Sequence, residues 1–127
     1  MKFHTRKLIK PDNLNAKNTL FGGALLRWID EEAAIYTMAK LNTQNVVTKY
    51  ISEINFIASA KQGDVIEIGM EITGVGTTSI SLKCLVRNLF SQKEIISIEK
   101  LIFVKVDDQG NAEPHGLTMD DLKAMKK

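Results

Sequence analysis

One uninterrupted helical run constrains the fold of this chain more than any other feature. From Ala24 to Lys40 no glycine or proline breaks a series of Ala, Leu, Ile, Trp, Met and Glu residues, which predicts a helix of about five turns. Apolar side chains occupy most of its circumference: Leu25, Leu26, Trp28, Ile29, Ala33, Ala34, Ile35 and Met38. A helix of this kind must be covered on most of its sides.

Almost everything after this helix has the pattern of β-strands. Segments rich in β-branched residues, with partial or full alternation of apolar and polar side chains and turn residues between them, cover 45–58, 65–73, 78–88 and 94–106. A short strand is expected before the helix, over 2–10, followed by a loop at 11–15. The sequence therefore predicts an α+β fold in which an antiparallel sheet wraps around one long helix, which is the hotdog architecture.

Length and composition fit a single domain. The 127 residues, 44% of them hydrophobic, can form one core over residues 1–127, with a short tail from about residue 110. In that tail Thr118 and Asp121 have the spacing of a capping box, so a short helix or a frayed end is expected over 117–127. Such a sheet leaves an edge strand and one flank of the helix uncovered, which predicts a homodimer paired through that edge.

Charge and cysteine content exclude several classes of protein. A net charge of +2 is too small to indicate a nucleic-acid partner, and Lys123, Lys126 and Lys127 read as a solvated tail. No apolar run approaches the roughly 20 residues needed to cross a bilayer, so we expect no membrane partner. The single cysteine, Cys84, falls in a predicted strand and is expected to be a buried structural thiol, which favours a reducing compartment, the cytoplasm.

Two glycines and one carboxylate give the helix the layout of a site. Gly22 and Gly23 would let a ligand approach the free N–H groups of the helix N-terminus, which can polarise a carbonyl. Asp30 follows Gly23 by seven residues, roughly 10 Å along the axis at 1.5 Å per residue. Asp30 as an acid or base and an oxyanion site at the N-terminus of the helix could act on one substrate. Alternatively, Asp30 belongs to a solvated face in which Arg27 and Glu31 form an ordinary pair.

Five sequence blocks resemble a known family. The first is Asn15-x-x-x-Thr19-Leu20-Phe21-Gly22-Gly23-x-Leu25-Leu26-x-Trp28-Ile29-Asp30-Glu31-x-Ala33-Ala34, and the others are Val46-Val47-Thr48, Ile54-Asn55-Phe56, Gly63-Asp64-Val65 and Val75-Gly76-Thr77-Thr78-Ser79-Ile80. Together, over roughly residues 8–106, they resemble the hotdog acyl-coenzyme A thioesterases of the cytosolic acyl-CoA hydrolase type.

The resemblance implies a function and a set of site residues. It implies hydrolysis of acyl-CoA to a free fatty acid and coenzyme A (CoA), with Asn15 and Asp30 as a catalytic pair contributed by opposite subunits of a homodimer, which could assemble further into a trimer of dimers. Gly22 and Gly23 would form the oxyanion site that receives the thioester oxygen, and Thr48 would bind substrate near the coenzyme A channel. Thr77, Thr78 and Ser79 would contact the coenzyme A portion. The implied chemistry needs no metal and no cofactor beyond the coenzyme A of the substrate.

The sequence also departs from the family pattern at two positions. Many relatives have Gly where this chain has Asn18, which tolerates the left-handed backbone conformation better than most residues, so we expect the turn to be kept. Position 19 is acidic or an amide in some relatives and Thr here, and we assign that side chain no supporting role.

Two other functions remain open from the sequence. One is a hotdog protein that binds acyl-CoA as a sensor or carrier without hydrolysing it, which would have no need of a carboxylate near the thioester. The other is a hotdog hydratase or dehydratase, which would use a His paired with an acidic residue around the central helix. His4 and His115 both lie outside that helix, and His115 reads as a loop residue.

Overall fold

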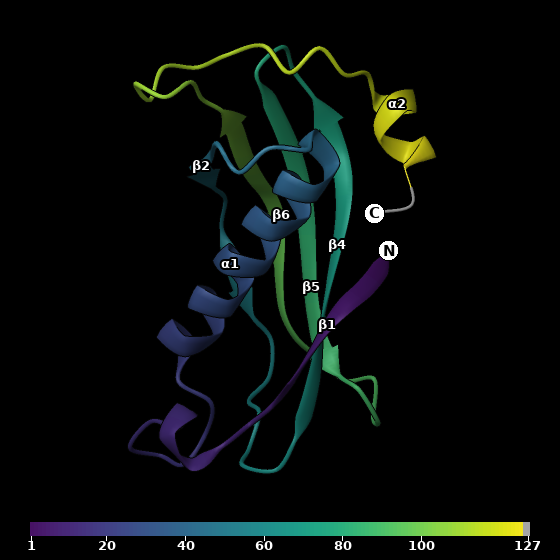
Figure 1. The fold of residues 1–127 in the computed structure, drawn as a ribbon. Helices are drawn as coiled ribbons and strands as arrows, with labels where there is room; N and C mark the ends of the chain where they lie inside the picture. Colours follow the sequence, from purple (N-terminus) through teal and green to yellow (C-terminus); the bar gives the residue numbers. More distant parts are fainter. Residues whose placement is uncertain (126–127) are drawn as a thin grey trace.

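The computed structural model describes residues 1–125 and shows one long helix against an antiparallel sheet (Figure 1). The helix α1 spans Gly22–Leu41. The strands are β1 (Lys2–Leu8), β2 (Val46–Ile51), β3 (Ile54–Phe56), β4 (Val65–Val75), β5 (Ser79–Asn88) and β6 (Glu94–Lys105). They are arranged in the order β1-β4-β5-β6-β2, with β3 also paired to β6, and every pairing is antiparallel. The predicted fold class is confirmed.

The core lies between one stripe of α1 and the facing side of the sheet. Leu25, Ile29, Ala33 and Thr37 recur every four residues along the helix and are buried. The sheet contributes alternate residues of its central strands, among them Ile66, Ile68, Ile80, Leu82, Cys84, Val86, Ile96, Ile98, Leu101 and Phe103. Cys84 is fully buried, as expected, and burial raises the pKa of its thiol to about 12.

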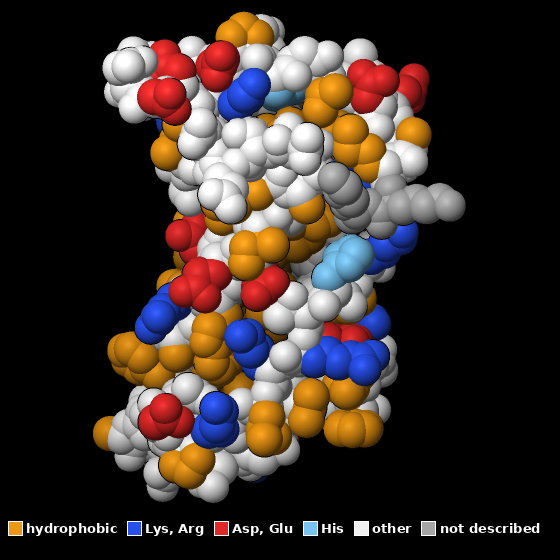
Figure 2. Space-filling view, in the orientation of Figure 1, with side chains coloured by type: hydrophobic (Ala, Val, Ile, Leu, Met, Phe, Trp, Pro, Cys, Tyr) orange, Lys and Arg blue, Asp and Glu red, His pale blue; other side chains and the backbone are white. Residues whose placement is uncertain are grey.

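The single chain covers α1 less completely than its composition predicts. The sheet covers the buried stripe, whereas Leu26, Trp28 and Ala34 are only partly buried and Ile35 is 55% exposed. Exposed hydrophobic side chains also follow the β2–β3 edge of the sheet: Val47, Tyr50, Ile51, Phe56 and Ile57. Figure 2 shows hydrophobic side chains at the surface over the lower half of the molecule, where α1 begins.

The structure differs from the predicted ranges of two strands and one loop. The segment predicted as one strand over 45–58 is two strands, separated at Ser52 and Glu53. Gly74, predicted to break the chain after 65–73, lies inside β4 at a register shift, and the strand ends only before Gly76. The predicted loop at 11–15 contains a 3-10 turn over Pro11–Asn13.

The C-terminal segment crosses the top of the sheet and ends in the short helix α2 (Met119–Ala124), as Figure 1 shows. The predicted capping box is confirmed, because the Thr118 hydroxyl accepts from the Asp121 N–H and the Asp121 carboxylate accepts from the Thr118 N–H. Leu122 is fully buried, and the Lys40 ammonium donates to the carbonyl oxygens of Leu122 and Met125. Of the predicted tail lysines, Lys126 and Lys127 lie outside the described residues.

Candidate functional site

A cavity of about 360 Å³ lies at the beginning of α1. The loop before the helix, the first residues of the helix and the segment after β3 form its walls. Its lining residues are Asn15, Thr19, Leu20, Gly22, Leu25, Phe56, Ile57, Ala58, Ser59, Ala60 and Ile95. Two of the predicted site residues, Asn15 and Gly22, therefore face one cavity.

The loop that carries Asn15 fixes the orientation of its side-chain amide. The backbone N–H groups of Lys17 and Thr19 donate to Asn15 Oδ1 at 2.9 and 3.2 Å. Because only the oxygen can accept these bonds, the amide nitrogen Nδ2 must lie on the other side, where it donates to the Thr19 hydroxyl at 3.0 Å. Among the described residues Nδ2 has no other hydrogen-bond partner, so its second hydrogen is free in a side chain that lines the cavity.

The turn after Asn15 depends on the left-handed conformation at Asn18. Its φ is +62°, so the expected conformation is confirmed. The turn closes with bonds from the Asn18 N–H to the Asn15 carbonyl and from the Asn15 N–H to the Thr19 carbonyl. Our assignment of no supporting role to Thr19 is wrong, because its hydroxyl is the only side-chain partner of the Asn15 amide nitrogen among the described residues.

The N-terminus of α1 is open to a ligand. The cap residue, Phe21, has no side-chain hydrogen bond to the helix, and no side chain in residues 1–125 accepts from the first N–H groups, those of Gly22, Gly23 and Ala24. The Phe21 ring lies against Gly23, where an added Cβ atom would approach it to 2.7 Å. Glycine at this position therefore lets the ring pack over the helix end, beside the cavity that Gly22 lines.

Asp30 lies further along α1 and faces the edge strand β2. Its side chain is partly buried, and its Oδ1 accepts a hydrogen bond of 2.8 Å from the Thr48 hydroxyl. Thr48 is exposed and lies where the pairing of β2 with β6 shifts register, between Thr48 and Tyr50. The neighbouring Arg27 and Glu31 form the expected pair, at 3.2 Å, and Asp30 takes no part in it.

Thr77, Thr78 and Ser79 lie at the connection between β4 and β5, with Ser79 beginning β5. Figure 1 places this connection at the opposite end of the molecule from the start of α1. Within one chain the predicted site residues thus form three groups: Asn15 with Gly22 and Gly23, Asp30 with Thr48, and the Thr77–Ser79 loop. The expectation that the helix mouth and Asp30 serve one substrate is not met inside a single chain, because Asp30 does not line the Asn15 cavity.

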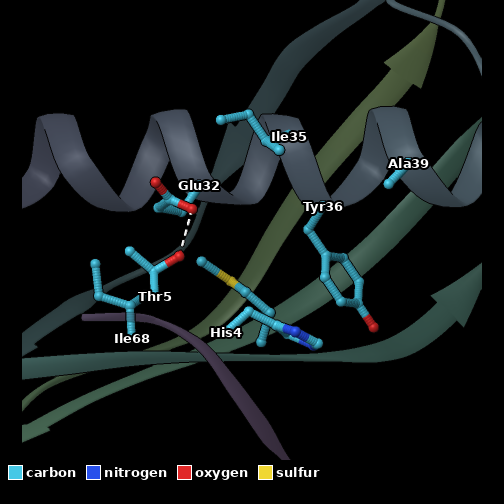
Figure 3. A pocket seen from close by; sticks show the side chains of 8 residues that line it. His4, Thr5, Glu32, Ile35, Tyr36, Ala39 and Ile68 are labelled. Carbon is cyan, nitrogen blue, oxygen red and sulfur yellow. Dashed lines mark hydrogen bonds between the residues drawn. The ribbon is translucent and has the colours of Figure 1, made fainter. Parts of the chain in front are cut away.

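A second pocket, of about 170 Å³, lies between α1 and the strands β1 and β4 (Figure 3). Its walls include Ile35, Ala39 and Ile68, and at one side the Thr5 hydroxyl donates to the Glu32 carboxylate. The Tyr36 ring points into it beside His4 (Figure 3). Burial, with a smaller contribution from the Glu71 carboxylate, raises the pKa of Tyr36. None of the predicted site residues lines this pocket.

Comparison with known proteins decides the family. The model of the thioesterase superfamily matches residues 17–93. The chain belongs to the thioesterase superfamily. The match begins next to the Asn15 turn and spans α1, the β2–β3 edge and the β4–β5 connection. The three groups of predicted site residues are therefore in or next to the part of this thioesterase-superfamily chain that carries the likeness.

Individual relatives agree with this family. The chain is 31% identical over 107 residues to an uncharacterized acyl-CoA thioester hydrolase of Bacillus subtilis, a match that covers 82% of this chain and 62% of that protein. An acyl-CoA hydrolase of Staphylococcus aureus, solved with butyryl coenzyme A, superposes with a TM-score of 0.77 at 29% identity, covering 87% of this chain and 66% of that one. A hexameric hotdog thioesterase of Campylobacter jejuni superposes with a TM-score of 0.78 at 25% identity, and the match covers 97% of this chain and 94% of that one. This superfamily member thus has the hotdog fold, and it spans less than two thirds of the Bacillus relative.

Among residues 1–125 no three His, Cys, Asp or Glu side chains gather as a metal site would require. In the same part of the chain, neither helix is long and apolar enough to cross a bilayer.

Proposed function

We propose that this protein hydrolyses acyl-CoA thioesters to a free fatty acid and coenzyme A. One observation carries the proposal: Asn15, whose amide nitrogen has a free hydrogen, and Gly22, at the uncapped N-terminus of α1, line the same cavity. Both supply hydrogen-bond donors, and a thioester carbonyl that becomes an oxyanion is a group that such donors stabilise. The S. aureus relative, solved with butyryl coenzyme A, supports this class of substrate.

The proposed reaction uses Asp30 as general base or as nucleophile. As a base, Asp30 takes a proton from water while the water oxygen attacks the thioester carbon. As a nucleophile, it attacks that carbon itself, and water later cleaves the resulting anhydride. In both cases the C–S bond breaks, coenzyme A leaves as a thiolate that takes up a proton, and the N–H groups at Gly22 and Gly23 hold the oxyanion. Thr48 orients the Asp30 carboxylate through its 2.8 Å hydrogen bond.

The proposed site is shared between the two subunits of a homodimer. Asp30 does not line the Asn15 cavity of its own chain, so we assign it to the cavity of the partner. The exposed hydrophobic residues of the β2–β3 edge and Ile35 on α1 support a contact between subunits there. The hexameric C. jejuni thioesterase supports further assembly into a trimer of dimers.

The S. aureus relative also supports the pair itself. Two of its variants were solved, one with an aspartate and one with an asparagine replaced by alanine, and these two positions are 15 residues apart. Asn15 and Asp30 have the same separation and order. We therefore keep both residues as the proposed catalytic pair.

The Thr77–Ser79 loop is proposed to bind coenzyme A, on the chemistry of its hydroxyl and N–H donors. We propose that the reaction needs no metal or further cofactor, and activity is expected to survive treatment with EDTA. The cytoplasm is the proposed location, in keeping with the buried free thiol of Cys84.

The experiment that tests the function measures free thiol released from acyl-CoAs of short, medium and long chain. Replacing Asp30 by Ala or Asn is expected to lower turnover by roughly 10²- to 10⁴-fold, because it removes the general base or nucleophile. Glu31→Ala, one residue away on the exposed face of the helix, is the matched control and should leave turnover unchanged. Near-normal release by the Asp30 variants would refute the assigned role. Tight acyl-CoA binding by the unmodified protein without any release would instead indicate a sensor or carrier.

A further inference from the structure

The Thr77–Ser79 loop is held by the C-terminal segment rather than by its own hairpin alone. The carbonyl of Thr77 accepts from the His115 N–H at 3.1 Å, and that of Thr78 accepts from the Lys105 N–H at 2.9 Å. The carbonyl of Ser79 accepts from the Gly76 N–H at 3.0 Å and lies 3.0 Å from His115 Nε2. All three carbonyls therefore face protein donors.

This arrangement leaves the donors of the loop for a ligand. Among the described residues no hydrogen bond uses the N–H groups or the hydroxyls of Thr77 and Thr78. Thr77 is exposed, and Thr78 is partly exposed. A loop whose carbonyls are bound by protein donors and whose Thr77 and Thr78 N–H and hydroxyl groups are unused suits an anion such as a phosphate.

His115 is held in one tautomer by its neighbours. The N–H of Leu117 donates to His115 Nδ1 at 3.0 Å, so Nδ1 carries no proton, and Nε2 must carry it and donate to the Ser79 carbonyl. Gly116, with a φ of +71°, makes the turn that brings the Leu117 N–H back to the ring. The ring thereby links the Ser79 carbonyl to the backbone that leads into α2.

We propose that His115 is a positioning residue for coenzyme A: it holds the Thr77–Ser79 loop with its donors outward, toward the phosphates of the nucleotide portion. The residue touches the loop and not the ligand, and it acts by fixing carbonyl directions. Figure 1 shows the C-terminal segment passing over the β4–β5 connection, where these contacts lie. The inference rests on the proposed function for its choice of ligand.

Binding of coenzyme A, measured by calorimetry, tests the proposal without requiring turnover. His115→Ala is expected to weaken binding about 10-fold, since it removes the side-chain hydrogen bond to the Ser79 carbonyl and the bond from the Leu117 N–H that holds the ring in place. His115→Gln, which can offer both an N–H and an oxygen, should recover most of the affinity. Thr118→Ala is the matched control, because it loosens the cap of α2 three residues away and leaves the contacts of His115 in place. Thermal unfolding of each variant reports on the fold.

Kinetics separate positioning from a merely structural role. For His115→Ala the KM of acyl-CoA should rise about 10-fold with little change in kcat, whereas hydrolysis of the acyl-pantetheine thioester, which lacks the nucleotide, should be unchanged. Equal losses on both substrates, or unchanged binding of coenzyme A, would overturn the inference. Coenzyme A binding that depends on His115 in a protein that releases no thiol would overturn the proposed function and leave this inference standing. An unmodified protein that does not bind coenzyme A would overturn the inference at once.

Discussion

At the scale of single residues, the side chain of Asn15 is oriented by its own loop. Two backbone N–H groups hold its oxygen, and the Thr19 hydroxyl holds one hydrogen of its nitrogen. The sequence predicts that Asn15 belongs to a site, but it does not indicate which end of the amide is held by the loop and which end keeps a free hydrogen. That detail depends on the left-handed turn at Asn18, which brings the Lys17 and Thr19 N–H groups to one oxygen.

Replacing Thr19 by Val is expected to lower kcat for acyl-CoA about 2- to 10-fold. The change keeps the shape of the side chain and removes one hydrogen bond to Asn15 Nδ2, a contribution of about 0.5 to 1.5 kcal/mol. Steady-state thiol release measures the effect, and Thr19→Ser, which keeps the hydroxyl, should retain most of the activity. Wild-type turnover in the Val variant would show that the Thr19 hydroxyl does not position the amide.

At the scale of helices and strands, periodicity predicts the elements but misses features set by pairing across the sheet. Glu67 lies on the polar side of β4 in the sequence pattern, yet it is buried. Its burial is possible because Arg87 on the neighbouring β5 donates to its carboxylate at 2.6 Å. In β6 the buried side changes phase between Ile98 and Leu101, where Glu99 and Lys100 form a register shift opposite Lys83. Neither feature is visible in one segment alone.

The same limit applies to the ends of the elements. The sequence does not show the break between β2 and β3, because it depends on two bonds to another strand: the Ser52 N–H donates to the Lys100 carbonyl, and the Lys100 N–H donates to the Ser52 hydroxyl. The capping box at Thr118 and Asp121 could be predicted, since its partners are three residues apart. Local contacts are therefore predictable here, and contacts between strands are not.

The docking of α2 can be tested at this scale. Leu122→Ala is expected to lower the free energy of unfolding by about 2 to 5 kcal/mol, because Leu122 is fully buried and its truncation leaves a cavity. Denaturant-induced unfolding gives the difference, and Lys123→Ala, an exposed neighbour on the same helix, should change it by less than about 0.5 kcal/mol. Equal stability of the two variants would mean that α2 does not pack on the domain in solution.

At the scale of the whole molecule, the predicted site residues are spread along the length of the hotdog. The start of α1 and the β4–β5 connection lie at opposite ends (Figure 1). Asn15 shares its cavity with Gly22 at the start of α1, the Thr77–Ser79 loop lies at the β4–β5 connection, and Asp30 belongs to α1. A twofold axis between two copies paired antiparallel at the β2–β3 edge would bring the Asn15 end of one subunit toward the loop end of its partner. The resemblance to a family implied a shared site, and the separation of the groups in one chain gives a physical reason for it.

A shared site makes a quantitative prediction for mixtures of two variants that each have lowered turnover, less so for Asn15→Ala than for Asp30→Ala. In subunits exchanged at random from equal amounts of Asn15→Ala and Asp30→Ala protein, half of the dimers contain one subunit of each kind. Each such dimer has one site in which both residues are intact and one in which both are missing. About one quarter of wild-type turnover should therefore return, provided that each site takes Asn15 from one subunit and Asp30 from the other.

The measurement is thiol release before and after mild denaturation and refolding of the mixture, with each variant treated alone as the control. If the mixture stays as inactive as its components while mass spectrometry shows that subunits have exchanged, the two residues do not act across the interface.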